Sequence, residues 1–333
     1  MSASGVTSAA FAKDGQNRAK ELFQSPVGTI GTALVVVILV GELWVGGSFL
    51  STSNVSIIGA FVAVPIIVGT LSSFALLSGV VDLSIGSMVG FSATIFAALS
   101  SGGWSVWWAA FVSLALSALF GLINSIVIVT LGTDPIIATL GMLIVLRGLV
   151  TVFNGGTGAI ASLVPGLFSF ANAQLGVVPT IFVLSLIVVV LATVVTVKTR
   201  LGRHVRAVGG DEQAARRAGI SVTRIRYGAL IVSALGAGIG GLLYIGQLGG
   251  SSNLLGTGLE FQVYAALMIG GYSILRGGVG NPSGGLMGLL VVAGVSNMLD
   301  VQAINPYYHD AIVGVLLIAA VLLDRLRGGD SYE

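Results

Sequence analysis

The sequence predicts an all-α, polytopic membrane protein with about ten transmembrane helices. Of its 333 residues, 55% are hydrophobic and only 8% are charged, whereas an ordinary soluble domain has about 25% charged residues. The apolar residues fall into ten runs near the length of about 20 residues that a helix needs to cross a membrane. Fourteen of the fifteen lysines and arginines lie on one side when these runs are threaded in order. A soluble fold is therefore excluded.

Charge asymmetry fixes the predicted orientation, with both termini in the cytoplasm. Residues 1–26 form a cytoplasmic segment without the apolar core of a removable signal peptide. Residues 27–325 form the transmembrane domain, and 326–333 a cytoplasmic tail. The spans are 27–50, 55–77, 83–100, 107–131, 135–153, 177–198, 227–248, 259–275, 284–304 and 309–324.

In this arrangement the outside loops hold no lysine or arginine, as the positive-inside rule requires. Arg147 alone among the basic residues lies within a span. The cytoplasmic set is Lys13, Arg18, Lys20, Lys198, Arg200, Arg203, Arg206, Arg216, Arg217, Arg224, Arg226, Arg276, Arg325 and Arg327.

The long outside loop, 154–176, predicts a short helix on the outer surface. Its apolar residues recur at helical spacing, and the helix would either close the loop or dock an external partner. The residues are Ile160, Leu163, Val164, Leu167 and Phe168.

Spans two to five and seven to ten form two groups of four that enter the membrane in opposite directions, as an inverted repeat requires. Many of the 49 glycines lie inside spans at small-residue spacing. Such residues let helix backbones approach closely in lipid, so they predict a tightly packed bundle. The pairs are Gly86 with Gly90, Gly236 with Gly240, and Gly284 with Gly288.

The basic segment between spans six and seven, 199–226, predicts a short exposed helix. Asp211 can cap its first turn, Arg216 and Arg217 favour its last turn, and Gly219 supplies a left-handed stop. A helix of about two turns is marginal in water by itself. We therefore expect a cytoplasmic partner protein to hold it.

This segment resembles the coupling segment of permease subunits of ATP-binding-cassette sugar importers, the branch that carries ribose, xylose and galactose. Three further stretches share the resemblance, which covers residues 55–325 in the expected order. They are Gly79-Val80-Val81-Asp82-Leu83-Ser84-Ile85-Gly86, Pro135 to Met142 with Arg147-Gly148, and Ile269-Gly270-Gly271 with Arg276-Gly277-Gly278-Val279-Gly280. Four spaced motifs are more specific than any one of them.

The resemblance implies a subunit of the bacterial inner membrane that conducts a monosaccharide or related small polar solute. Its implied partners are a cytoplasmic ATPase, an extracytoplasmic solute-binding protein and a second permease subunit, identical or homologous; nucleic acid is not expected. It assigns contact with the ATPase to Gly202, Arg203, Gly209, Gly210, Asp211, Glu212, Ala214, Ala215, Arg216 and Gly219.

The sequence itself favours transport over catalysis. It contains no phosphate-binding Gly-x-x-x-x-Gly-Lys-[Ser/Thr] loop and no cysteine, and its two histidines fall on opposite sides of the predicted membrane. We expect no cofactor or metal in this chain, with ATP and Mg²⁺ bound by the partner ATPase.

Four polar residues in or beside the spans are candidates for the translocation path: Asp82, Asn124, Arg147 and Asn297. Each also has a structural interpretation. Asp82 can cap the third span. The asparagines, like Gln262 and Asn253, could hydrogen-bond a solute's hydroxyl groups, but such amides more commonly join helices.

A guanidinium in a span costs about 2.5–3.5 kcal/mol unless it is partnered. Arg147 should therefore meet a backbone carbonyl, meet Glu42, or line the passage. We expect Glu42 to be the one other ionisable side chain well inside a span.

Two other functions stay open. A branched-chain amino-acid permease belongs to the same importer superfamily. An ion-coupled secondary transporter would also have broken spans, but it would be expected to have more acidic side chains near the membrane midplane. An intramembrane enzyme is disfavoured, because no nucleophile and base occur together at helical spacing.

Overall fold

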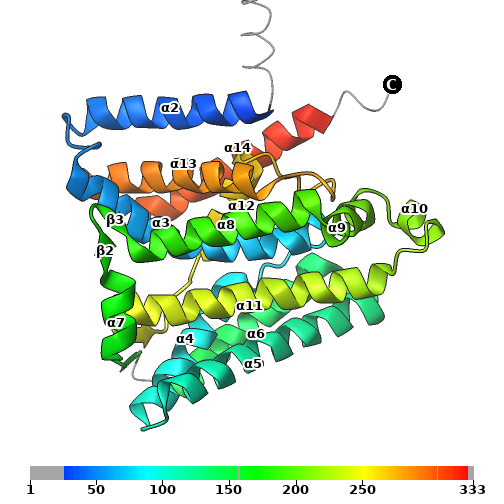
Figure 1. Cartoon of the computed structure of the whole chain (residues 1–333), viewed down its shortest axis with the longest axis horizontal. Coiled ribbons are helices and arrows are strands. Elements are labelled where there is room, and N and C mark those ends of the chain that lie inside the picture. Colours follow the sequence, from blue (N-terminus) through cyan, green and yellow to red (C-terminus); the bar gives the residue numbers. More distant parts are fainter. Residues whose placement is uncertain (1–25, 156–157, 306, 329–333) are drawn as a thin grey trace, which may run out of the picture.

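The computed structural model describes residues 26–155, 158–305 and 307–328. Its long helices run side by side, with α9 and α10 at one end and α7 and a small hairpin at the other (Figure 1). The predicted N-terminal segment, apart from Pro26, and residues 329–333 of the predicted tail lie outside the described residues. The elements are α2 (Pro26–Trp44), α3 (Thr52–Leu77), α4 (Ile85–Ser101), α5 (Val106–Ser125), the π-helix η1 (Ile126–Thr130), α6 (Pro135–Phe153), β1 (Ala159–Ala161), α7 (Pro165–Asn172), β2 (Gln174–Leu175), β3 (Val178–Pro179), α8 (Thr180–Lys198), α9 (Arg200–Gly210), α10 (Glu212–Arg217), α11 (Val222–Leu248), β4 (Gly250–Ser252), α12 (Leu259–Ile269), α13 (Pro282–Val301) and α14 (Tyr307–Gly328).

Within the described residues, six helices are long and apolar enough to cross a membrane, and four shorter apolar helices accompany them. Each predicted span overlaps one of these ten, but two predicted spans run well past the end of the helix. The first helix ends at Trp44 rather than near residue 50, because Gly46 and Gly47 adopt positive φ. The eighth ends at Ile269 rather than 275, because Gly271 turns the chain at φ +87°. Glycine enters this conformation without the penalty that a Cβ imposes.

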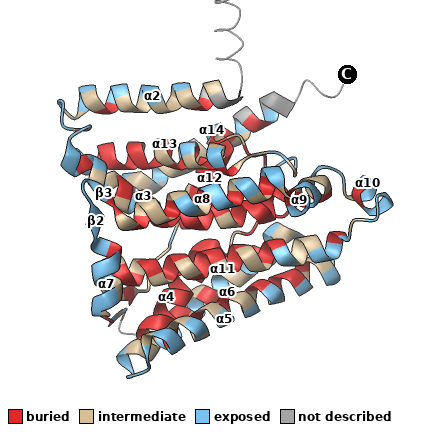
Figure 2. Cartoon of the chain, in the orientation of Figure 1, coloured by how far each residue is buried: buried red, intermediate tan, exposed pale blue. Residues whose placement is uncertain are grey.

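The centre of the bundle consists of α3, α4, α11, α12 and α13, which contain most of the buried residues, while α5 and α6 have largely exposed apolar surfaces (Figure 2). The glycine pairs lie at the central contacts, as predicted. On α11, a Cβ at Gly236 or Gly240 would press against Leu71 or Val68 of α3. Close backbone approach is thus a main source of packing energy in this core.

Two non-helical segments enter the bundle from opposite ends. Residues 78–84 lead from α3 into α4, and residues 249–258 lead from α11 into α12. The two short helices begin beside one another, since a Cβ at Gly86 of α4 would overlap Glu260 and Gly256. The fold therefore brings two helix N-termini together inside the bundle.

The predicted helix of the outside loop is displaced along the chain. Ile160 belongs to strand β1, which pairs antiparallel with β4 opposite Ser251, and α7 begins only at Pro165. Proline favours the first helical turn because its fixed φ suits a helix and its missing N–H is not needed there. Asn172 then holds α7 to α11 by donating a hydrogen bond to the Gly246 carbonyl at 3.1 Å.

Candidate coupling and translocation sites

The segment between α8 and α11 forms two helices where the sequence predicted one. In α10, Asp211 Oδ1 accepts a hydrogen bond from Ala214 N at 2.9 Å, and Gly219 follows the helix at φ +77°. The predicted cap and stop are therefore confirmed. The additional helix, α9, is capped by Thr199, whose Oγ1 accepts from Gly202 N at 3.2 Å. The adjacent glycines at 209 and 210 obscured α9 in the sequence.

A small apolar contact holds α10 against the bundle. Ala215 is buried with Val208 of α9 and Val222 of α11. The other face of the segment is open to solvent. Of the residues assigned to ATPase contact, the exposed ones are Arg203, Gly210, Asp211, Ala214, Arg216 and Gly219.

Gly209 joins α9 to the interior of the bundle. A Cβ at this residue would overlap the Leu77 carbonyl at the end of α3 and lie 2.6 Å from Gly278 N. The same neighbours bond to each other, because Gly278 N donates to the Leu77 carbonyl at 2.9 Å. Arg206 Nη1 adds a hydrogen bond to the Gly278 carbonyl at 3.4 Å. At Gly209, α9 therefore contacts both the end of α3 and the loop between α12 and α13.

Charged groups make a second connection. Glu212 pairs with Arg216 at 2.8 Å within α10 and with Arg226 of α11 at 2.7 Å. Arg226 Nε also donates to the Ser78 carbonyl, just after α3, at 3.3 Å. The hydrogen bond from Arg216, and secondarily the charge of Arg226, lower the pKa of Glu212 below its usual value.

Sequence reasoning did not assign Arg206 or Arg226 to the site. The resemblance drew attention to the exposed surface of the segment, whereas these two arginines bond carbonyls that are distant in sequence. Their position among many basic residues gave no signal of this.

Arg147 of α6 meets a backbone carbonyl, one of the three expected arrangements. Its Nη1 donates to the Leu255 carbonyl at 2.9 Å, within the segment that precedes α12. The proposed pairing with Glu42 is wrong, because Glu42 lies in the last turn of α2 and accepts a hydrogen bond from Leu50 N at 3.0 Å.

The acidic residue that interacts with Arg147 is Glu260, in the first turn of α12. It was not identified from the sequence. Its side chain is buried, and Oε2 has no hydrogen-bond partner among the described residues. It is electrostatically coupled to Arg147. Its place at the very edge of a predicted span made it look like a boundary residue.

Asp82 is buried in a closed hydrogen-bond network. Oδ1 accepts from Ser84 N at 3.1 Å and from Ser84 Oγ at 2.6 Å, and Oδ2 accepts from Ser233 Oγ of α11 at 2.7 Å. Its backbone N–H donates to the Tyr264 hydroxyl of α12 at 2.8 Å. This geometry fastens the turn before α4 to α11 and α12. The predicted capping role is wrong, because the N-cap residue of α4 is Ser84, and no side chain of the described residues makes a capping hydrogen bond there.

The two asparagine candidates also join helices. Asn124 of α5 donates to Ser84 Oγ at 3.1 Å. Asn297 of α13 and Asn54 of α3 exchange amide hydrogen bonds at 2.8 and 3.0 Å. The structure therefore does not bring the four path candidates into one site, because Asn297 lies in a separate pair.

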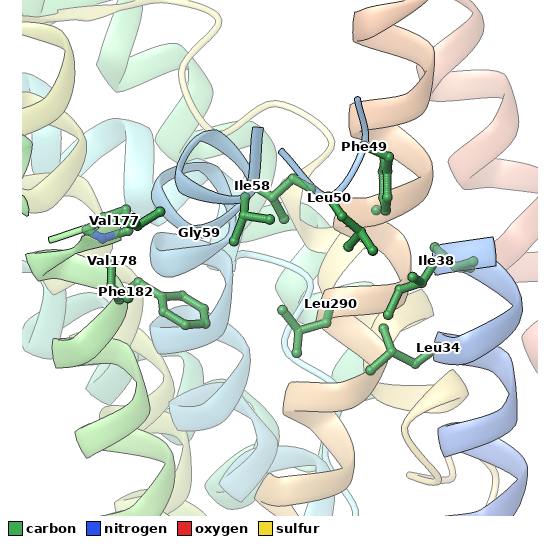
Figure 3. A pocket seen from close by; sticks show the side chains of 14 residues that line it. Leu34, Ile38, Phe49, Leu50, Ile58, Gly59, Val177, Val178, Phe182 and Leu290 are labelled. Atoms are coloured by element: carbon green, nitrogen blue, oxygen red, sulfur yellow. The ribbon is translucent and has the colours of Figure 1, made fainter. Parts of the chain in front are cut away.

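An apolar groove of about 240 Å³ opens between α2, α3, α8 and α13 (Figure 3). It offers no polar side chain with which to bind a solute's hydroxyl groups. Its lining is Leu34, Val37, Ile38, Phe49, Leu50, Val55, Ile58, Gly59, Val177, Val178, Pro179, Phe182, Leu290 and Gly294.

Comparison with known proteins agrees with a transport role. The chain is 32% identical over 307 residues to the D-allose transport system permease protein of Escherichia coli (strain K12), covering 92% of this chain and 93% of that protein. It is 30% identical over 299 residues to the autoinducer 2 import system permease protein of Escherichia coli O9:H4 (strain HS), covering 89% and 87%. The ribose import permease protein of Escherichia coli (strain K12) is 28% identical over 298 residues, covering 88% and 92%.

No solved structure matches the chain. Residues 50–321 match the family described as branched-chain amino acid transport system / permease component. This match covers most of the chain and includes α3 to α13, so it contains both α9 and α10 of the candidate coupling site. The chain belongs to this family of transport permeases.

Proposed function

We propose that this chain is the translocation subunit of an ATP-driven, binding-protein-dependent importer of a monosaccharide or related polar solute. Family membership and the similarity to the D-allose and ribose permeases support the transport role and the solute class. The observation that carries the proposed mechanism is the position of α9 and α10, a partly exposed helix pair bonded to the ends of α3 and α11 and to the loop before α13.

In this proposal the end that bears α9 and α10 faces the cytoplasm, as do both termini, and about ten helices cross the inner membrane. Lys198 through Arg226 then lie on the cytoplasmic side, in agreement with the positive-inside rule. The broken entries into α4 and α12 from opposite ends support an inverted repeat of α3–α6 and α11–α14, since discontinuous helices recur at matching places in such repeats.

A separate ATPase dimer binds ATP and Mg²⁺ and grips the exposed face of α9 and α10. When the dimer closes, the pair moves, and Gly209 transmits the displacement to α3 and to residues 277–278. The ion pairs of Glu212 carry it to α11. Coupling of this kind requires that the ATPase contacts differ between the outward-open and inward-open states.

An extracytoplasmic binding protein delivers the solute to the opposite end, which bears α7, and a second permease subunit completes the passage. The hydrogen bonding of Asp82 weighs against ion coupling, and the other buried carboxylate in this region, Glu260, interacts with the charge of Arg147. Asp82 is fully engaged in hydrogen bonds with Ser84 and Ser233, so it is not available as a free carboxylate for ion exchange.

The decisive experiment replaces Glu212 and Arg216 together by glutamine, or deletes residues 211–219, in the complete importer. We expect the protein to insert normally but to lose the link between ATP hydrolysis and uptake. Substrate-stimulated ATPase activity and uptake at wild-type levels in both variants would contradict the proposal. Uptake by the isolated chain under an ion gradient would support the secondary transporter instead.

A further inference from the structure

A second cavity differs in character from the apolar groove of Figure 3. It has a volume of about 420 Å³ and lies between the outer part of α3, the end of α11, the segment 249–258 and the start of α12. This size falls in the usual range of about 300–1,000 Å³ for small-molecule sites. Its wall consists of Phe61, Tyr244, Gln247, Leu248, Ser252, Leu254, Leu255, Gly256, Thr257, Leu259 and Gln262.

Four polar side chains on this wall make no hydrogen bond with the described part of the chain: Tyr244, Ser252, Thr257 and Gln262. The contrast with Asp82 and Asn297 is direct, because those side chains are fully engaged by protein partners. Polar groups at membrane depth cost free energy unless something bonds to them. The unengaged groups of this cavity therefore indicate water or a polar solute.

Two hydrogen bonds also hold the walls of the cavity in place. Gln247 Nε2 donates to the Ala60 carbonyl of α3 at 2.9 Å, which leaves its carbonyl oxygen as an acceptor. On the far side of the segment 249–258, Arg147 bonds the Leu255 carbonyl. Arg147 is thus a positioning residue for one wall of the cavity, and it does not itself line it.

The chemistry of the wall selects a class of ligand. It combines hydroxyl and amide groups with the aromatic rings of Phe61 and Tyr244, and none of its lining residues is charged. An amino acid would bring a carboxylate and an ammonium group, whose burial without a charged partner is costly. A neutral polyhydroxylated solute would satisfy the free groups without that cost.

We propose that this cavity is the outer solute-contact site of the passage and that it takes a neutral polyol such as a monosaccharide. The inference rests on the proposed import function, because it assigns that function's solute a location. Tyr244 and Gln262 hydrogen-bond the hydroxyl groups, and Phe61 offers a ring for the apolar face of the sugar.

The absence of cysteine from the sequence permits a direct test of water access. Single variants Thr257→Cys and Gln262→Cys are made in cells with the complete importer and treated with an external trimethylammonium methanethiosulfonate reagent. We expect both to react, as Ser53→Cys does near the start of α3, while Val190→Cys on the apolar surface of α8 does not. Failure of both cavity variants to react would overturn the proposal.

The second arm measures ATP-dependent uptake of labelled D-allose, D-ribose and L-leucine. Tyr244→Phe and Gln262→Leu, which delete hydrogen-bonding groups with little change of shape, should each lower kcat/KM for the transported sugar by about two- to tenfold, the effect of one hydrogen bond. Gln174→Leu, at the outer surface, is the matched control. Expression levels and basal ATPase activity are measured to exclude misfolding.

The outcomes separate the two proposals. If the wild-type importer takes up a sugar and both Tyr244→Phe and Gln262→Leu match the Gln174→Leu control in uptake, the solute-contact site is refuted and the import function stands. Uptake of leucine in place of the sugars refutes the polyol class. If the wild type takes up none of the three probes, the proposed function fails, and the solute contact that rests on it fails as well.

Discussion

Glu212 and Arg226 form an ion pair in which Oε2 lies 2.7 Å from Nη1, and this pair connects α10 to α11. The same arginine donates through Nε to the Ser78 carbonyl beyond α3. One side chain thus links the exposed helix to two of the central helices. A partly exposed ion pair of this kind contributes only about 0.2–1 kcal/mol to stability, so under the proposed mechanism its loss should affect coupling more than folding.

Replacing Arg226 by alanine should weaken coupling more than folding. We expect fewer solute molecules imported per ATP hydrolysed, at nearly normal expression, because the link from α10 to Ser78 is lost. Arg224→Ala is the control, since Arg224 is exposed on the same helix and makes no such bond among the described residues. Equal transport stoichiometry in the two variants, measured in proteoliposomes, would refute this role.

The adjacent residues Gly209 and Gly210 provide a matched pair of substitutions that tests helix packing. Gly209→Ala introduces a methyl group that overlaps the Leu77 carbonyl, whereas a Cβ at Gly210 meets nothing within 4 Å. Overpacking costs about 1–3 kcal/mol, so Gly209→Ala should lower the melting temperature of the purified protein. Gly210→Ala should leave it unchanged or slightly raised. Identical melting curves for the two variants would contradict the close approach of α9 to α3.

The lowered pKa of Glu212 gives a pH prediction. A carboxylate with a depressed pKa in the folded state contributes stability above its unfolded pKa of about 4.3, and the contribution disappears as pH falls through the folded pKa. The difference in thermal stability between wild type and Glu212→Gln should stay constant from about pH 8 to 6 and vanish only below about pH 4. A difference that does not change as the pH falls from about 6 to 3 would show that the pKa of Glu212 is not lowered.

The amide pair of Asn54 and Asn297 predicts non-additive stability. Asn297→Leu leaves the buried Asn54 amide without this partner and should cost about 0.6–2 kcal/mol, the range for hydrogen bonds between membrane helices. Asn54→Leu with Asn297→Leu removes both amides and should recover part of that loss. Thermal unfolding in detergent of both single variants and the double variant measures the coupling. Additive losses would mean that the two side chains act independently.

Composition and hydropathy predicted most of the fold, because an apolar run of about 20 residues in lipid must satisfy its backbone as a helix. Local capping rules likewise placed α10 between Asp211 and Gly219. The predictions failed where the chain leaves regular structure. Pro165 displaced the outer helix, and Gly271 shortened α12. A count of apolar residues in a sequence window does not show where a single proline or glycine begins or ends a helix.

The roles of individual polar residues followed a different rule. Asp82, Asn124 and Asn297 looked like path residues because polar groups in spans are rare, yet the fold engages all three with protein partners. Conversely, Gln262 looked like a helix-joining residue, and it lies unengaged on the wall of a cavity. The difference between these cases is the presence of a partner on a distant helix.

The sequence by itself determined that this protein is a helical membrane bundle with one basic end and a capped, exposed helix there, because these properties depend on local hydrophobicity, charge and turn chemistry. Only the tertiary structure decided that Arg226 reaches Ser78, that Arg147 meets the Leu255 carbonyl, and that Gly209 fits between α3 and residue 278. These contacts join segments about 70 to 150 residues apart, and their geometry depends on how closely the helices pack.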